Sequence, residues 1–154
     1  MTPEQKLRDL KIELPPVPKA VGLYQPCIIV GNLCYTSGHV PLMLDGSVLK
    51  GCVGRDADQQ AGQIAARQCG LAILSTVRAR LGSLDRIKRL VKLLGFINCT
   101  PEFTQQPAVM NGCSELMIQV FGPEAGVGVR SAVGTNALPL GILVEVEAVF
   151  ELNE

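Results

Sequence analysis

The chain has 154 residues and a mass of 16.4 kDa, the size of one domain large enough to bury a hydrophobic core. Its 14 Lys and Arg residues balance 14 Asp and Glu residues, so the sequence offers no basic field for nucleic acid or an anionic membrane. Hydrophobic residues make up 47% and charged residues 18%, which is more apolar than a small monomer needs and favours a subunit of an oligomer.

No apolar run approaches the roughly twenty residues of a membrane-spanning helix, and the charged N-terminus does not resemble a signal peptide. We therefore expect a cytoplasmic protein that does not bind membranes. The cysteines have no C-x-x-C spacing and mostly fall within apolar segments, which favours buried reduced thiols over a metal or redox motif. They are Cys27, Cys34, Cys52, Cys69, Cys99 and Cys113.

Residues 1–18 are interpreted as an arm ahead of a single domain over residues 19–154. A helix is predicted to begin the arm, because Thr2 is a candidate N-cap, a proline follows it, and Gln5 lies where a capping box needs it. Prolines end this helix after Leu14. The arm would cover a sheet edge or a neighbouring subunit, and a partly disordered tail is the alternative.

The next segment predicts a β-hairpin. Residues 27–30 and 33–40 are apolar runs separated by a Gly-Asn pair, which is typical of a two-residue turn. Ser37 and Gly38 interrupt the second run, and a glycine within a strand often marks a bulge or a close approach of the backbone. A third, weaker strand is predicted over residues 47–53.

The central part of the chain predicts two helices around a strand. The first helix covers residues 57–81, with Asp56 as its N-cap and a glycine after its end. A strand follows over residues 87–100, and the second helix covers residues 107–121 and ends at Gly122. The apolar face of the first helix, which suits close packing on a sheet, comprises Ala57, Ala61, Ile64, Ala65, Leu71, Ala72 and Leu74.

Two strands are predicted near the C-terminus, over residues 130–135 and 142–150, joined by a tight connection. The second alternates, so that one face is entirely apolar and the other carries Glu145 and Glu147 among aliphatic neighbours. A half-buried carboxylate there can have its proton affinity tuned; two solvated glutamates on an exposed face are the alternative. Together the predicted elements indicate an α+β fold with helices on one face of a sheet.

Short motifs occur at both ends of this domain: Tyr24, Val30-Gly31-Asn32, Tyr35 to Pro41, Arg130-Ser131-x-Val133, Leu138-Pro139 and Val144 to Ala148. Together they resemble the reactive intermediate deaminase family, also called Rid or YjgF-like and historically endoribonuclease L-PSP. The resemblance covers roughly residues 19–152. It implies a chorismate-mutase-like fold (bacillus type), a mixed sheet with two helices packed on one face, and a homotrimer with the sheets inward and a cleft at each subunit contact.

The resemblance also implies a chemistry, the hydrolysis of small 2-imino or 2-enamino acids to 2-keto acids and ammonia without a cofactor. Arg130 would grip the substrate carboxylate, for which a guanidinium fork is well shaped. Glu145 would orient or activate the attacking water. By the same resemblance the cleft would also be lined by Tyr24, Ser37, Gly38 and Asn111.

One position departs from the family pattern. Ala132 stands where many members have a cysteine that contacts the substrate, which leaves open a non-catalytic trimer that binds a small molecule or a partner. His39, the only histidine, occupies a position that is often glutamine, and a structural role is favoured over proton transfer. The neutral charge and the lack of a basic, aromatic groove argue against a ribonuclease.

Overall fold

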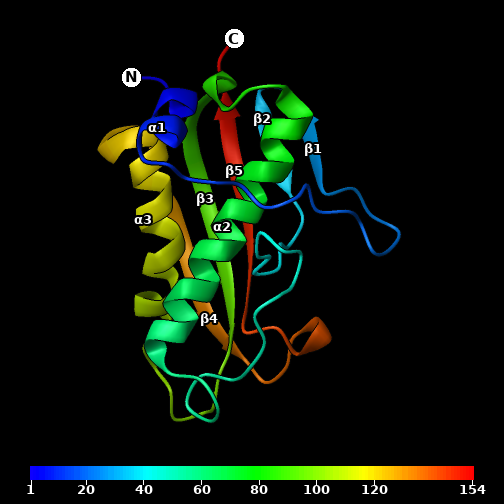
Figure 1. The fold of residues 1–154 in the computed structure, drawn as a ribbon, viewed down its shortest axis with the longest axis vertical. Helices are drawn as coiled ribbons and strands as arrows, with labels where there is room; N and C mark the ends of the chain where they lie inside the picture. The colour runs from blue at the N-terminus through cyan, green and yellow to red at the C-terminus, as the bar shows by residue number, and fades with distance from the viewer.

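The computed structural model describes residues 1–154 and contains one mixed five-stranded sheet, with helices on one face and the other face open (Figure 1). The strand order is β1-β2-β5-β3-β4, and only β3 and β4 run parallel. The strands are β1 (Cys27–Val30), β2 (Leu33–Thr36), β3 (Ile87–Asn98), β4 (Val129–Thr135) and β5 (Val144–Leu152). The helices are α1 (Pro3–Asp9), α2 (Gln59–Leu81) and α3 (Gln106–Ala125), with 3-10 turns η1 (Leu84–Arg86) and η2 (Pro139–Gly141).

The predicted fold class is confirmed in its main features, since α2 and α3 cover one face of a mixed sheet. A third helix, α1, lies outside this layer. It contacts α3 and η1 rather than a sheet edge. Its Leu7 belongs to the main hydrophobic core and is only 5% exposed to solvent. The predicted capping box of Thr2 and Gln5 is present. The helix ends at Asp9, before the predicted end at Leu14, and Lys11 just beyond it takes a positive φ of 52°.

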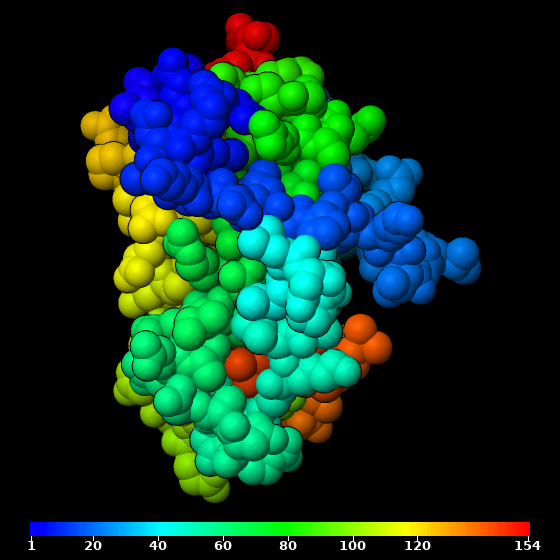
Figure 2. Space-filling view, viewed as in Figure 1, coloured from blue at the N-terminus to red at the C-terminus, as the bar shows by residue number.

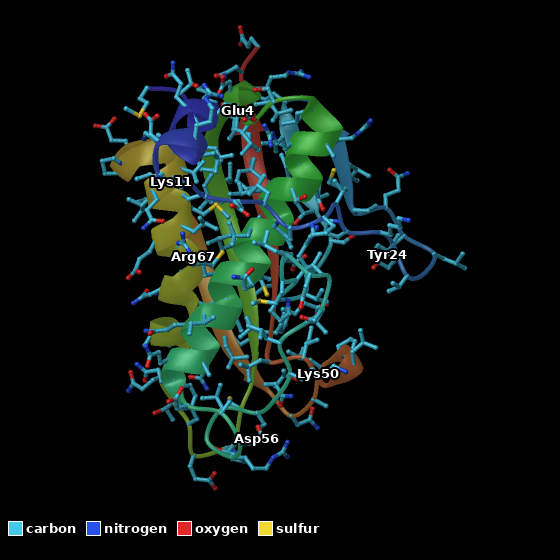
Figure 3. All side chains as sticks on the ribbon, in the orientation of Figure 1. Glu4, Lys11, Tyr24, Lys50, Asp56 and Arg67 are labelled. Atoms are coloured by element: carbon cyan, nitrogen blue, oxygen red, sulfur yellow. The ribbon has the colours of Figure 1, made fainter.

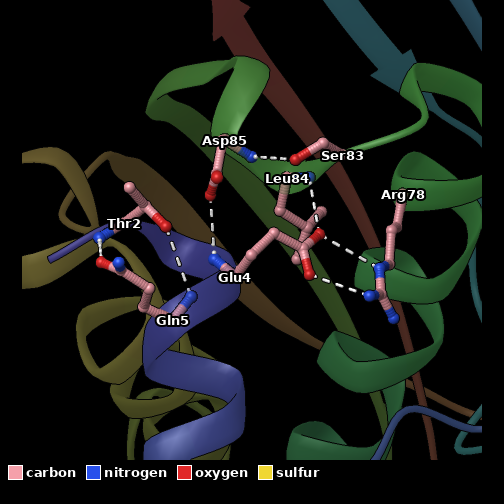
Figure 4. Close-up of polar contacts among 7 residues, drawn as sticks. All are labelled: Thr2, Glu4, Gln5, Arg78, Ser83, Leu84 and Asp85. Atoms are coloured by element: carbon pink, nitrogen blue, oxygen red, sulfur yellow. Dashed lines mark hydrogen bonds and ion pairs between the residues drawn. The ribbon is translucent and has the colours of Figure 1, made fainter.

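Glu4 anchors this first helix (Figure 4). Its two carboxylate oxygens bind two nitrogens of the Arg78 guanidinium, Nε at 3.1 Å and Nη2 at 2.9 Å. The carboxylate also accepts a hydrogen bond from the Leu84 backbone N–H at 3.0 Å. The Glu4 backbone N–H in turn donates to the Asp85 carboxylate at 2.9 Å. These contacts join α1, α2 and η1, and the sequence pattern did not indicate them because the partners lie about eighty residues away.

The β1-β2 hairpin is confirmed, with Gly31 at a φ of 62° in its turn. The second strand is shorter than predicted and ends at Thr36. The predicted strand over residues 47–53 is wrong: this segment makes only isolated bridges, such as Leu42 with Val48. Glycines at positive φ, at positions 46 and 51, turn the chain away from a continuous ladder.

The two long helices pack against each other through glycines. An added Cβ at Gly112 would lie 2.0 Å from the Gln63 carbonyl oxygen, and one at Gly70 would lie 2.9 Å from Leu116. The N-cap of α2 is Asp58, whose carboxylate accepts from Ala61 N–H, so the prediction of Asp56 was wrong by two residues.

The remaining predictions for these helices are mixed. Gly82 ends α2 in the left-handed region as expected, and a φ of 93° at Gly122 interrupts α3. The predicted apolar face of α2 is largely buried, but Ile64 is 48% exposed.

The C-terminal strand β5 lies at the centre of the sheet. Its alternation is confirmed, because Val144, Val146, Ala148 and Phe150 face the buried side. The two C-terminal strands are not hydrogen-bonded to each other, since β3 lies between them. Their connection passes through η2, where Leu140 has a φ of 61°.

The open face of the sheet is largely apolar. Every strand contributes exposed or half-buried apolar side chains to this face, which also carries the charged residues Glu145, Glu147 and Lys92. The apolar ones are Ile28, Val30, Tyr35, Leu94, Phe96, Val129, Val133 and Val149.

All six cysteines are buried and unbridged, as the sequence predicted. Their thiols lie in or beside the core that the helices form with the sheet.

None of the helices is long and apolar enough to cross a membrane.

We predict that Glu4→Ala lowers the free energy of unfolding by about 1–3 kcal/mol, because it removes charge-assisted hydrogen bonds that hold α1. Urea denaturation would measure the change. Arg55→Ala is the matched control, since its ion pair with Asp56 at 3.5 Å is solvent-exposed and its loss should cost less than about 0.5 kcal/mol. Equal losses in the two variants would contradict the anchoring role of Glu4.

Candidate functional site

Glu145 is a half-buried carboxylate near the start of β5, on the open face of the sheet. Its cross-strand neighbour is Phe96 of β3. Burial raises the pKa of the Glu145 carboxyl above its ordinary value, and the charge of Glu147, two residues along the same face, raises it further. A carboxylate with a raised pKa is a better base than an ordinary one, as a proton-transfer role requires.

Gly38 lies directly against this carboxylate. An added Cβ at Gly38 would be 2.9 Å from both the carboxyl carbon and Oε1 of Glu145, so no other residue fits without displacing it. The sequence expectation of a bulge is confirmed by the register. Tyr35 pairs with Val149 and His39 with Val146, so four residue steps on one strand oppose three on the other.

His39 holds the bulge from the buried side. It is 3% exposed, and its Nδ1 lies 2.7 Å from the Ser37 carbonyl, which can only accept a hydrogen bond. Nδ1 therefore carries the proton, and Nε2 accepts from the Thr76 hydroxyl of α2 at 2.8 Å. Burial keeps the pKa of His39 below its ordinary value. With both ring nitrogens engaged, His39 is a structural histidine, in agreement with the favoured interpretation.

Tyr24 and Ser37 lie on the same side of the molecule as Gly38. All three line a cavity of about 380 Å³ between the arm and the segment after β2. The Ser37 hydroxyl donates to the Gln25 carbonyl at 2.6 Å, while Tyr24 is 46% exposed on a loop that projects from this edge (Figure 3).

Arg130 lies elsewhere, on β4 at the opposite edge of the sheet. Its Nη1 donates to Asn111 Oδ1 at 2.9 Å and to Ser114 Oγ at 3.0 Å, and its Nη2 donates to the Pro107 carbonyl at 3.3 Å. These contacts pin the guanidinium to α3. Of its five N–H groups, two remain after these three bonds. Arg130 and Asn111 line a smaller cavity of about 250 Å³.

The predicted residues therefore fall into two groups within one chain. Glu145, Gly38, Ser37 and Tyr24 gather around the bulge, at the β1-β2 side of the sheet. Arg130 and Asn111 gather at the β4 edge, and Arg130 points to the helix-covered face, because its register partner is the buried Leu93. The two charged residues that were predicted to act together are thus separated by the sheet.

The largest hollow contains none of these residues. It measures about 860 Å³ and lies near the start of α2, beside Lys50 and Asp56, at the far end of the molecule from Glu4 (Figure 3). Three of its four charged side chains already have protein partners, since Arg55 pairs with Asp56 and Asp58 caps α2, whereas Lys50 forms no ion pair. We therefore base the candidate site on the two smaller cavities. No group of His, Cys, Asp and Glu is arranged to hold a metal ion.

Sequence reasoning missed three residues that act on this site. Ser114 helps to hold Arg130, and its spacing of three residues from Asn111 on one helix was the available signal. Glu147 tunes Glu145, which its two-residue spacing in a strand suggested. Leu140 lines the cavity beside the bulge, and no local pattern indicated this.

The mixed sheet with helices on one face and a carboxylate beside a bulge defines a class of chorismate-mutase-like proteins. Residues 4–152 match the family described as "YjgF/chorismate_mutase-like, putative endoribonuclease". The chain therefore belongs to this YjgF, or Rid, family.

Individual relatives agree with this assignment. Protein TCP17 of Trypanosoma cruzi is 42% identical over 96% of this chain and 92% of its own. The crystal structure of a "putative endoribonuclease" from Shewanella oneidensis is 33% identical, with a TM-score of 0.94, and covers 99% of this chain and 100% of its own. The crystal structure of RidA from the Antarctic bacterium Psychrobacter sp. PAMC 21119 is 26% identical, with a TM-score of 0.62, over 88% and 94% of the two chains.

We predict that Glu147→Gln lowers the pKa of Glu145, because it removes a like charge that disfavours the ionised form. Carboxyl NMR titration would measure the shift. Glu151→Gln is the control, since Glu151 lies farther along the strand and is neutralised by Lys88 and Arg89 at 2.9 and 2.6 Å. An unchanged Glu145 pKa in the Glu147 variant would show that burial alone sets it.

Proposed function

We propose that the protein hydrolyses small 2-imino or 2-enamino acids to 2-keto acids and ammonia. The observation that carries the proposal is Glu145, a carboxylate of raised pKa held against the backbone of Gly38. Membership of the Rid family and the pinned guanidinium of Arg130 support it. No cofactor is part of the proposal.

In the proposed reaction, Arg130 binds the substrate carboxylate through its two remaining N–H groups. The imine enters protonated by solvent, and Glu145 accepts a proton from water as the water oxygen adds to the C=N carbon, which gives the neutral carbinolamine. The protonated Glu145 then donates this proton to the carbinolamine nitrogen. The C–N bond breaks as the hydroxyl proton returns to solvent, and ammonia and a 2-keto acid leave. Because such imines also hydrolyse in water, positioning and proton transfer are the contributions required of the protein.

The separation of Arg130 from Glu145 supports a cleft shared between subunits. In a cyclic oligomer of three or more subunits each interface is heterologous, so one edge of a subunit meets a different edge of the next. The β4 edge with Arg130 can then face the bulge with Glu145 of a second copy. The apolar open face of the sheet, which includes exposed Val129 and Val133, provides surface for this association. We propose a homotrimer with the sheets inward.

A trimer that binds a ligand without turnover is the second candidate, and Ala132 is the observation that favours it. Ala132 lies on β4 two residues after Arg130, and its methyl group provides no polar contact to a substrate. An endoribonuclease, the activity in the family description, is less well supported, because the chain has no net charge and only 4% aromatic residues.

We predict that the wild-type protein accelerates ammonia release when an amino-acid oxidase generates an imine in the assay. Arg130→Ala should lower kcat/KM about ten- to hundredfold, since the lost charge-assisted hydrogen bonds are worth about 1.5–3 kcal/mol. Arg67→Ala is the control, because Arg67 binds Gln119 on the outer helix layer at 2.9 Å. No acceleration by the wild type with any imine would leave the binding trimer as the better account.

The shared cleft predicts complementation between two impaired variants. Arg130→Ala and Glu145→Gln subunits co-expressed in equal amounts should recover about a quarter of the wild-type rate, because random assembly gives that fraction of clefts both native residues. Each variant alone should retain at most about a tenth of the wild-type rate, and sedimentation would establish the number of subunits. Failure of the mixture to recover activity would place both residues in a cleft of one chain.

A further inference from the structure

The cavity beside the bulge continues past Gly38 into an apolar space. Its walls come from the arm, from the segment after β2 and from η2, and Figure 2 shows the surface hollowed between the projecting residues near 20 and the residues near 140. The volume of about 380 Å³ is at the small end of the range typical of ligand pockets, about 300–1,000 Å³. The apolar side chains that define it are Val17, Val21, Val40, Leu42, Val48 and Leu140.

Three of these side chains are exposed to an unusual degree. Val21 is 89% exposed, Leu140 67% and Val17 54%, and all three lie at the rim of one cavity. Leu140 also has a φ of 61°, a left-handed conformation that costs a β-carbon-bearing residue free energy. Strained residues of this kind persist preferentially at ligand sites. Both observations indicate that the rim is completed by an apolar group.

The buried and half-buried polar side chains of the cavity wall already have protein partners, and the Tyr24 hydroxyl, which accepts from the Val21 N–H at 3.4 Å, lies on the exposed loop. Both ring nitrogens of His39 are engaged, and the Ser37 hydroxyl donates to Gln25. The only charged residue in the wall, Lys19, is exposed to solvent. A polar side chain entering the cavity would therefore lose hydrogen bonds to water and find few replacements, apart from the Tyr24 hydroxyl at the exposed side.

We propose that this cavity receives the side chain of the imino acid, and that the preferred substrates are imines of amino acids with large apolar side chains. The inference rests on the proposed function, because it places the reacting carbon beside Gly38 and Glu145. Gly38 contacts the Glu145 carboxyl and also lines the cavity. A substrate attacked there can direct a branched or aromatic side chain between the arm and Leu140.

The first test compares kcat/KM for imines that an L-amino-acid oxidase generates from leucine, phenylalanine and alanine. We expect the leucine and phenylalanine imines to be preferred over the alanine imine by about tenfold or more. Val21→Asp should reduce this preference, because it places a carboxylate at the cavity mouth without touching the core. Leu44→Asp is the matched control, since Leu44 is 55% exposed and lies outside the cavity.

The second test measures binding separately from turnover. Calorimetry with 4-methyl-2-oxopentanoate and with pyruvate should give about tenfold tighter binding of the former, and Val21→Asp should remove the difference. Turnover of all imines with equal kcat/KM would overturn the side-chain pocket and leave the proposed function intact. Absence of turnover together with selective binding of the larger keto acid would overturn the proposed function alone. Equal binding of the two keto acids would overturn the pocket whatever the turnover.

Discussion

The candidate site depends on one extra residue in the ladder between the β2 segment and β5. The resulting bulge brings the Gly38 backbone against Glu145, and His39 holds it through the Ser37 carbonyl and the Thr76 hydroxyl. The same histidine exchanges two backbone hydrogen bonds with Val146, at 2.7 and 3.1 Å, next to the catalytic candidate. Helix α2, the bulge and β5 are therefore coupled through one buried side chain. The position of the Glu145 carboxylate therefore depends on all three elements, since a shift of α2, of the bulge or of β5 would move it.

Much of the fold was predictable because its signals are local. The capping box at Thr2, the hairpin turn at Gly31, the stop at Gly82 and the alternation of β5 each depend on a few neighbouring residues, and all were confirmed. The strand expected over residues 47–53 failed because β-pairing depends on a partner that the segment does not find. The N-cap was misplaced because two aspartates precede α2 and either could serve.

The site was harder to predict for a different reason. The identity of Glu145 and Arg130 came from motif resemblance, whereas their placement depends on which face of the sheet each residue occupies. Arg130 lies opposite the buried Leu93 of β3 in the sheet register, so its side chain points to the helix-covered face. The residue pattern of β4 alone does not reveal this. The parallel pairing of β4 with β3 directs the guanidinium toward α3. One chain therefore presents two half-sites, and the sequence contains no information about the distance between them.

The wall of the apolar cavity has a further consequence for how relatives can diverge. Residues 16–21 comprise the end of the arm and the three residues after it. The chain before them is held at two points, by the ion pair of Glu4 with Arg78 and by the Pro15 carbonyl, which accepts from Ser75 Oγ at 2.8 Å. Residues 16–21 contribute no strand to the sheet and no partner to Glu145 or Arg130. Substitutions in this wall can accumulate without disturbing the sheet or the charged groups. A lineage could therefore exchange one set of ligands for another while its fold, its carboxylate and its arginine stay unchanged.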